Sequence, residues 1–302
     1  MKILLTGASG YIGKQLLPVL IKDGHEVTCC VRDKSKFDLK PYNNGNLNVV
    51  EVDFLKPDSL KAIPKDIDAA YYLIHSMSSS TGDFEDLEST SANNFKTRIQ
   101  ETDAKQVIYL SGIINSKELS KHLSSRKAVE EILSGGSYHL TTLRAGIIVG
   151  SGSASFEIIR DLVKKLPIMV APRWLNTKSQ PIAIENVTQF LNGVLLNTYT
   201  FQKSFDIGGP EILTYKEMLL NFAEVMGLKR RIYVVPVMTP KLSSYWLYFI
   251  TSTTYKLAVN LVDSMKIEII CEKNDLGDKL GIIPMSYNNA VQKALEIPAR
   301  QD

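Results

Sequence analysis

Short apolar runs alternate with segments of helical periodicity through the first half of the chain. This alternation is typical of a parallel sheet with helices on both faces, and it predicts an α/β fold with a Rossmann-type doubly wound sheet. The expected strands are Lys2–Thr6, Glu26–Val31, Asn48–Asp53, Ala69–Ile74, Gln106–Ser111 and Leu140–Ile148. The expected helices between them are Tyr11–Lys22, Ser59–Ile63, Phe84–Glu101 and Ser124–Leu133.

The regular alternation of apolar runs and helical segments ends after Gly150, where we expect a smaller lobe to begin. In chain order the sequence predicts a helix at Ser155–Leu166, an irregular stretch at 167–178, an extended segment at 181–184, a helix at Val187–Leu196, a strand at Phe205–Ile207 that returns to the sheet, and helices near Tyr215–Met226, Leu242–Ile250, Tyr255–Cys271 and Tyr287–Leu295. Residues 1–150 are thus expected to form the sheet domain, with returning segments near 181–209, and residues 151–302 mostly the C-terminal lobe.

Composition narrows the classes of partner. The 302 residues include 35 Lys and Arg against 32 Asp and Glu, a balance too even to attract a polyanion such as nucleic acid by its net field. The longest stretch without a charged residue runs only from Asn186 to Gln202, and it is interrupted by polar residues, so no transmembrane segment is expected. The first residues lead directly into an apolar run without room for a signal peptide. We expect a cytoplasmic protein.

The three cysteines do not indicate a metal site. Cys29 and Cys30 are adjacent in an expected strand, and Cys271 lies far along the chain. This spacing fits neither a disulfide framework nor a set of metal ligands, and alternation across a strand is typical of packing residues.

A glycine-rich turn joins the first expected strand to the first expected helix, where the chain reads Thr-Gly-Ala-Ser-Gly-Tyr-Ile-Gly over residues 6–13. The first glycine can take a tight turn, the second lets the backbone approach a pyrophosphate, and the third allows close packing of helix on strand. The N–H groups at the helix start would bind the anion. The expected cofactor-binding residues of this turn are Thr6, Gly7, Ser9, Gly10, Tyr11, Ile12 and Gly13.

This turn resembles the fingerprint of the extended and atypical short-chain dehydrogenase/reductases. Further matches are 52–54, 110–112, 143–146, Gly150, 181–184 and 186–187, and together they cover most of the chain. The segments 72–77, 151–156 and 171–174 resemble a bacterial branch described as NAD(P)-binding, NmrA-like or nucleoside-diphosphate-sugar-epimerase-like. The resemblance implies a nicotinamide dinucleotide as cofactor and a substrate crevice between the lobes, without naming a reaction.

The end of the second expected strand bears on the choice of dinucleotide. An NAD-specific site places a carboxylate there, and alignment with the family puts Val31 at that position. Arg32 follows, with Lys34 and Lys36 nearby, and these cations favour the 2′-phosphate of NADP. Asp33 keeps NAD open as the alternative, and a merely solvated loop is a further one.

The resemblance also implies residues along the rest of the dinucleotide. Asp53 and Phe54 would border the adenine, and Ile74, His75 and Ser76 would lie on the ribose and nicotinamide side. Their structural alternative is a strand end followed by a polar loop.

The catalytic motif of the family is altered. Typical members have Tyr and Lys at i and i+4 after the fifth strand, and the matching positions here are His122 and Arg126, with Ser125 between them and Glu130 following. Arginine still supplies positive charge, and histidine could replace the tyrosine as proton donor, with its pKa near 6.5 lowered by the adjacent cation. Alternatively, His122 is an exposed residue in the first turn of a helix.

Ser111 is the hydroxyl nearest to the end of the fifth expected strand. It is a candidate hydrogen-bond donor to the substrate, although the usual catalytic Ser or Thr of the family aligns nearer Ile113, which cannot act. Tyr109 points along the strand interior and is expected in the core.

Two further segments bear on the substrate. The stretch 167–174 lies where the family builds its substrate lip; Arg173 could hold a carboxylate or phosphate, and Trp174 could add an apolar wall. The alternative places Trp174 between the lobes and Arg173 at the surface. The aromatic segment 242–250 suggests either an apolar partner or a buried core helix.

Two functions remain. The first is an NADP-linked oxidoreductase or epimerase-like enzyme acting on a small organic substrate in the crevice between the lobes. The second is a non-catalytic dinucleotide-binding redox sensor or assembly factor, which the altered His122 and Arg126 positions favour. Fold alone does not separate them. Oligomeric state is not readable from the sequence.

Overall fold

The computed structural model describes residues 1–302 with the exception of 39–41, 43–45, 75–83, 115–120, 236–264 and 297–302. Its main sheet has seven parallel strands in the order β11-β6-β5-β4-β1-β2-β3. The strands are β1 (Lys2–Leu5), β2 (Glu26–Val31), β3 (Leu47–Glu51), β4 (Ala69–Tyr72), β5 (Gln106–Gly112), β6 (His139–Ala145) and β11 (Lys203–Ile207). The expected doubly wound sheet and its returning seventh strand are confirmed.

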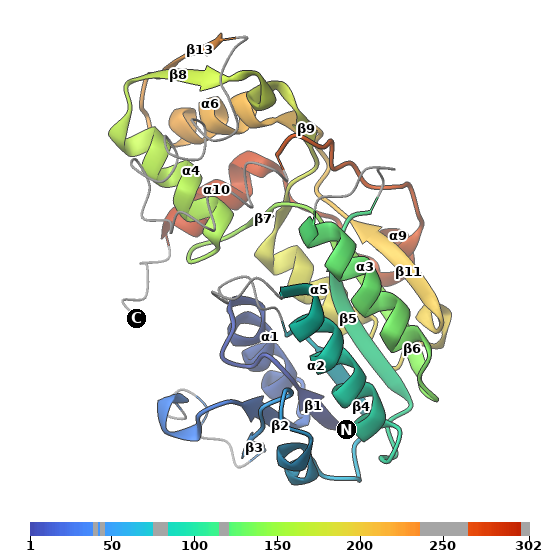
Figure 1. Ribbon diagram of the computed structural model, residues 1–302. Helices are drawn as coiled ribbons and strands as arrows, with labels where there is room; N and C mark the ends of the chain where they lie inside the picture. Colours follow the sequence, from blue (N-terminus) through green and yellow to red (C-terminus); the bar gives the residue numbers. More distant parts are fainter. Residues whose placement is uncertain (39–41, 43–45, 75–83, 115–120, 236–264, 297–302) are drawn as a thin grey trace.

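Helices cover both faces of this sheet (Figure 1). One face is covered by α1 (Tyr11–Lys22) and α5 (Ile184–Gly193), which pack together over alternate strand residues such as Leu5 and Tyr71. The other face is covered by α2 (Phe84–Ile99) and α3 (Lys121–Ser134), over Leu4 and Tyr72. Both sets of side chains are buried because every central strand has a helix layer on each side.

A separate apolar cluster holds the upper part of the molecule in Figure 1. It is built from α4 (Ala154–Lys165), α6 (Tyr215–Val225) and α10 (Tyr287–Glu296), beside the parallel pair β8 (Ile168–Pro172) and β13 (Arg231–Val235). The remaining elements are η1 (Lys34–Lys36), η3 (Pro57–Ala62), β7 (Ile148–Val149), η4 (Arg173–Asn176), β9 (Lys178–Ser179), β10 (Ile182–Ala183), η5 (Thr198–Thr200), β12 (Leu213–Thr214) and α9 (Leu276–Leu280). The exact domain boundary stays a prediction.

Three expectations for the elements were wrong. The stretch 167–178 is not irregular, because β8 pairs with β13 through Met169 and Ile232 and β9 follows. The expected strand at 140–148 ends at Ala145, and the chain turns through Gly146 before β7. The expected helix at 255–271 is wrong for 265–271, which is extended around Ile269, and its first ten residues lie outside the described part.

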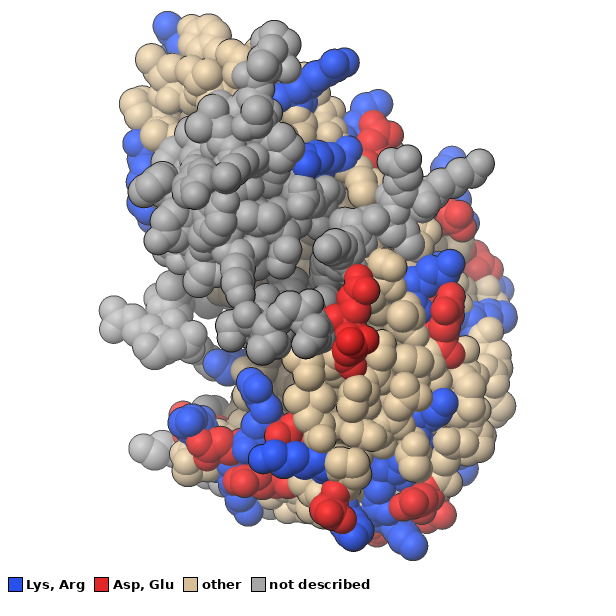
Figure 2. All heavy atoms as spheres, viewed as in Figure 1, with Lys and Arg blue, Asp and Glu red and all other residues tan. Residues whose placement is uncertain are grey.

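The described surface agrees with the even charge balance. Figure 2 shows basic and acidic side chains interspersed over the half of the molecule that carries the sheet, without a large patch of one sign on the face in view. In the part of the chain that the structure describes, no helix is long and apolar enough to span a membrane. The segment 242–250 lies outside the described residues, and the cytoplasmic location stays a prediction.

Candidate active site

A cavity of about 930 Å³ lies at the carboxyl ends of the parallel strands. This is the edge where doubly wound sheets bind their ligands, because the connection direction reverses on either side of the first strand. Its lining begins with Gly7, Arg32 and Asp53 at the ends of β1, β2 and β3, and it continues to Ser111 at the end of β5. In the sheet order, β2 and β5 are three strand spacings apart, or about 14 Å at about 4.8 Å for each spacing.

The glycine turn forms one wall of this cavity. Gly7 has φ +65°, a left-handed conformation, and a Cβ there would lie 2.5 Å from the carbonyl oxygen of Leu73. A Cβ on Gly13 would lie 2.3 Å from the carbonyl oxygen of Gly7, so this glycine lets α1 approach the turn. Gly10 differs, because the nearest atom to a Cβ there is the Gly7 oxygen at 3.1 Å. The protein itself leaves nearly enough room at Gly10, and the space in front of it belongs to the cavity.

Gly13→Ala is expected to destabilise the fold. The new methyl group would overlap the turn backbone, and overpacking of this kind costs about 1–3 kcal/mol. Chemical denaturation of the wild-type and variant proteins would measure the change in the free energy of unfolding. Equal midpoints and slopes would show that the helix shifts freely away from the turn.

The start of α1 faces the cavity with free backbone donors. Gly10 is the N-cap residue, no side chain caps the helix, and its first turn carries no acidic residue. Ser9, Tyr11 and Ile12 also line the cavity. Thr6 is placed differently, because its buried hydroxyl donates to the carbonyl oxygen of Tyr71 at 2.9 Å and accepts from the N–H of Leu73 at 3.1 Å. Thr6 therefore fixes the turn against β4 and does not itself line the described cavity.

The two residues after β2 that bear on cofactor choice have different surroundings. Arg32 is exposed and lines the cavity. The carboxylate of Asp33 instead accepts hydrogen bonds from the backbone N–H of Ser35 at 3.0 Å and from its hydroxyl at 2.6 Å, and it pairs with Lys36 at 2.9 Å. The Ser35 and Lys36 hydrogen bonds lower the pKa of Asp33 to about 2. At neutral pH this carboxylate is ionised and caps the turn η1.

The ends of β3 and β4 also contribute to the lining. Asp53, Phe54 and Ile74, which the resemblance places along the dinucleotide, line the cavity. One Asp53 oxygen accepts from the N–H of Leu55 at 3.1 Å, while the buried Phe54 ring lies 6.0 Å from Phe95. The predicted His75 and Ser76 lie outside the described residues.

The opposite end of the cavity is lined by Ser111 and Arg126. The Arg126 Nη1 donates to the hydroxyl of Tyr109 and to the carbonyl oxygen of Leu110, each at 3.3 Å. Both partners are neutral, and none of the described carboxylates forms an ion pair with Arg126. The Arg126 Nε and the Ser111 Oγ are buried and without a hydrogen-bond partner among the described residues. Both residues line the cavity, where a bound molecule would satisfy these atoms.

Tyr109 is buried, as expected, but it also supports the site. Its ring lies 5.9 Å below the Arg126 guanidinium carbon, and its hydroxyl holds one guanidinium nitrogen. Burial raises the pKa of the Tyr109 phenol, and the nearby Arg126 charge opposes this effect. The phenol is therefore neutral at physiological pH and acts as a positioning group for Arg126.

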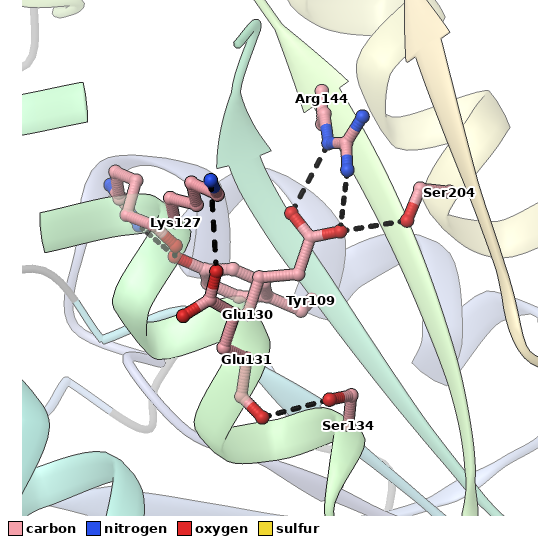
Figure 3. Close-up of polar contacts among 8 residues, drawn as sticks. Tyr109, Lys127, Glu130, Glu131, Ser134, Arg144 and Ser204 are labelled. Carbon is pink, nitrogen blue, oxygen red and sulfur yellow. Dashed lines mark hydrogen bonds and ion pairs between the residues drawn. The ribbon is translucent and has the colours of Figure 1, made fainter. Parts of the chain in front are cut away.

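The other positions of the altered motif have separate roles. His122 belongs to α3, but its side chain lies outside the described part. The buried Ser125 hydroxyl donates to Glu88 of α2. Glu130 accepts two hydrogen bonds from Arg144, at 3.1 and 2.7 Å, and one from Ser204 at 2.7 Å (Figure 3). Glu130 thus connects α3 to β6 and β11 and does not line the cavity.

The two residues predicted for the substrate lip are not among the described residues that line the cavity. Arg173 is exposed at the start of η4 and is not among the described lining residues. Trp174 is half-buried, and its ring packs edge-on against Tyr215 at 6.2 Å. Tyr215 lines the cavity, so Trp174 supports that wall from behind. A direct role of either residue in substrate binding stays a prediction.

Several lining residues were not identified from the sequence. Ser153 is the N-cap of α4, accepting from the N–H of Phe156 at 3.3 Å, and Ile158 and Tyr215 extend the wall. The segment 151–156 was noted for its resemblance, and a serine before an amphipathic run is an N-cap signal that could have placed it. Tyr215 belongs to α6, far along the chain, and no local sequence pattern indicates that it lines the cavity.

The family comparison agrees with this geometry. Residues 7–147 match the family model described as NAD(P)H-binding. This segment is therefore similar to NAD(P)H-binding domains. Its bounds run from the first glycine of the turn to the connection after β6, and they include Arg32, Ser111 and Arg126. A search of curated proteins found no match.

Solved structures extend the likeness over the whole fold. A nucleoside-diphosphate-sugar epimerase from Staphylococcus aureus has a TM-score of 0.77 at 16% identity, over 97% of this chain and 100% of that chain. Triphenylmethane reductase from Citrobacter sp., complexed with NADP(H), gives the same values. The NADPH-dependent quinone oxidoreductase from Escherichia coli, complexed with NADPH, has a TM-score of 0.74 at 14% identity, over 97% of this chain and 99% of that chain. The resemblance to atypical short-chain dehydrogenase/reductases is confirmed for the fold.

Proposed function

We propose that the protein is an NADP-linked oxidoreductase that acts on a small organic substrate in the described cavity. The observation that carries the choice of cofactor is the contrast at the end of β2, where Arg32 lines the cavity and Asp33 is engaged in η1. A guanidinium can bind the 2′-phosphate of NADP through charge-assisted hydrogen bonds. Two of the structural neighbours were solved with NADPH or NADP(H), which supports the same choice.

The dinucleotide fits the residues present. Gly10 and the free N–H groups at the start of α1 would hold the pyrophosphate, and Arg32 the 2′-phosphate. When bound, the cofactor supplies a hydride. Ser111 and Arg126 lie toward the opposite end of the cavity, where their partnerless donors would bind the substrate oxygen and stabilise negative charge on it. His122 is proposed as the proton donor.

Calorimetry with NADPH and NADH tests the cofactor assignment. We expect tighter binding of NADPH, and Arg32→Ala should weaken NADPH binding by about tenfold or more, the scale of a lost charged hydrogen bond, while NADH binding changes little. Lys61→Ala is the matched control, because Lys61 is an exposed cation that pairs with Asp58 away from the cavity. Equal affinities for the two dinucleotides in the wild-type protein would contradict the assignment.

The sensor or assembly function is the competing outcome. It predicts tight NADPH binding without turnover of any carbonyl compound. Loss of NADPH oxidation in a broad substrate screen, together with retained binding, would therefore favour that function over the enzyme.

A further inference from the structure

The half of the cavity beyond Ser111 has an apolar wall. The side chains come from the end of β5, from α3, from the connection before β7, from α4 and from the strand-like segment beside β9. They are Ile113, Leu123, Ile147, Ile158, Ile159 and Ile269. Most of these residues are buried, so they form a well-packed apolar surface toward the cavity.

Charge is nearly absent from this wall. Three charged residues line the cavity in the described part of the chain, and two of them, Arg32 and Asp53, lie at the nucleotide end. Arg126 is therefore the one charged side chain among the described residues of the apolar half. Ser111 lies in the same end of the cavity, and its hydroxyl also lacks a described partner.

A nucleotide sugar would bind weakly against such a wall. Its diphosphate and its sugar hydroxyls would lose their water on entry, and each polar group buried without a partner carries a cost of about 1–3 kcal/mol. The branched aliphatic side chains offer those groups no hydrogen bonds, and the polar groups beside them are a few hydroxyls, such as those of Ser153 and Tyr215. An apolar ring system would instead gain from contact with the same isoleucines.

We propose that the substrate is an apolar carbonyl compound, such as an aromatic ketone or aldehyde, and not a nucleotide sugar. Its body would lie against Ile147 and Ile158, and its single oxygen would accept hydrogen bonds from Arg126 and Ser111. This inference rests on the proposed function. The reaction is balanced by NADPH: its hydride adds to the carbonyl carbon, the π electron pair moves to the oxygen, a proton completes the alcohol, and NADP⁺ is released.

The test is calorimetric titration of the NADP⁺-loaded protein with two probes, naphthyl methyl ketone and UDP-glucose. NADP⁺ prevents reduction, so the heat reports binding alone. We expect the ketone to bind at least tenfold more tightly than UDP-glucose. Ile147→Asn should weaken ketone binding about tenfold without changing NADPH binding, and Met265→Asn, at another lining position, serves if the first variant fails to fold.

Ile283→Asn is the matched control, because Ile283 is 90% exposed and does not line the cavity. It should leave ketone binding unchanged. Tighter binding of UDP-glucose, no ketone binding, or ketone binding that both lining variants leave intact would overturn the substrate class. Failure of NADPH to bind would instead overturn the proposed function itself, so the two failures are distinguishable.

Discussion

Gly10→Val should abolish dinucleotide binding while the protein remains folded. The branched side chain would occupy the space in front of the turn, where the pyrophosphate must approach the backbone. The nearest protein atom to the new Cβ is the Gly7 carbonyl oxygen at 3.1 Å, so the Cβ itself requires only a small local adjustment. We expect NADPH affinity to fall by about hundredfold or more, the result of losing several charge-assisted hydrogen bonds together, as measured by calorimetry.

Two other glycines calibrate this result. Gly135→Val adds the same side chain after α3, where the nearest atom lies 3.6 Å from the Cβ, and Gly135 is not among the residues that line the described cavity; this variant should leave binding intact. Gly13→Ala should mainly lower the free energy of unfolding, because its methyl group would overlap the turn backbone. If Gly10→Val retains NADPH affinity and a native circular dichroism spectrum, the glycine turn is structural only and the proposed phosphate site is wrong.

Arg126→Gln should lower the turnover of an apolar ketone by about 10²-fold. The guanidinium is the one charge among the described residues of the apolar half, and removing a donor to a developing oxyanion has an effect of about this size. NADPH binding should change little, because Arg126 lies toward the end opposite to Arg32. The rate of NADPH oxidation with naphthyl methyl ketone is the measurement.

Lys127→Gln is the control for this variant, because Lys127 follows on the same helix, is exposed and pairs with Glu131 at 3.8 Å. It should react at the wild-type rate. His122→Ala should separately remove about 10²-fold of the rate if imidazole donates the proton. Unchanged turnover in Arg126→Gln would show that the guanidinium positions the strand end and does not act on the substrate.

The main sheet was predictable because its signals are local. Each central strand is an apolar run that helices cover on both faces, and the glycine turn marks the first crossover. Even the seventh strand was detectable from Phe205 and Ile207, whose alternation fits an extended segment.

The errors lie where pairing is distant. β8 carries the half-exposed sequence Ile-Met-Val-Ala-Pro, and its partner β13 comes about sixty residues later, so neither strand has a local signal for the other. The segment at Ile269 was predicted as a helix, although Ile267, Glu268 and Ile269 alternate as a strand does. In the fold, the N–H of Ile269 donates to the carbonyl oxygen of Lys178 at 3.1 Å, an interaction that overrides helical propensity.

The candidate site was predictable in part for the same reason. Gly10 could be placed because it starts the first helix after the glycine turn, and Arg32 because it directly follows β2; the structure puts both beside the cavity. The support of Arg126 by Tyr109 was not foreseen, since it depends on α3 lying over β5. The apolar wall combines residues from five separated segments, so no single segment of the sequence predicts it.

A crystal structure of the protein with NADPH bound would test the central claim most directly. We predict electron density for the dinucleotide along the carboxyl ends of the strands, with the pyrophosphate at Gly10, the 2′-phosphate against Arg32 and the nicotinamide beside Ser111. Density that places the 2′-phosphate away from Arg32, or the nicotinamide away from Ser111 and Arg126, would contradict the account.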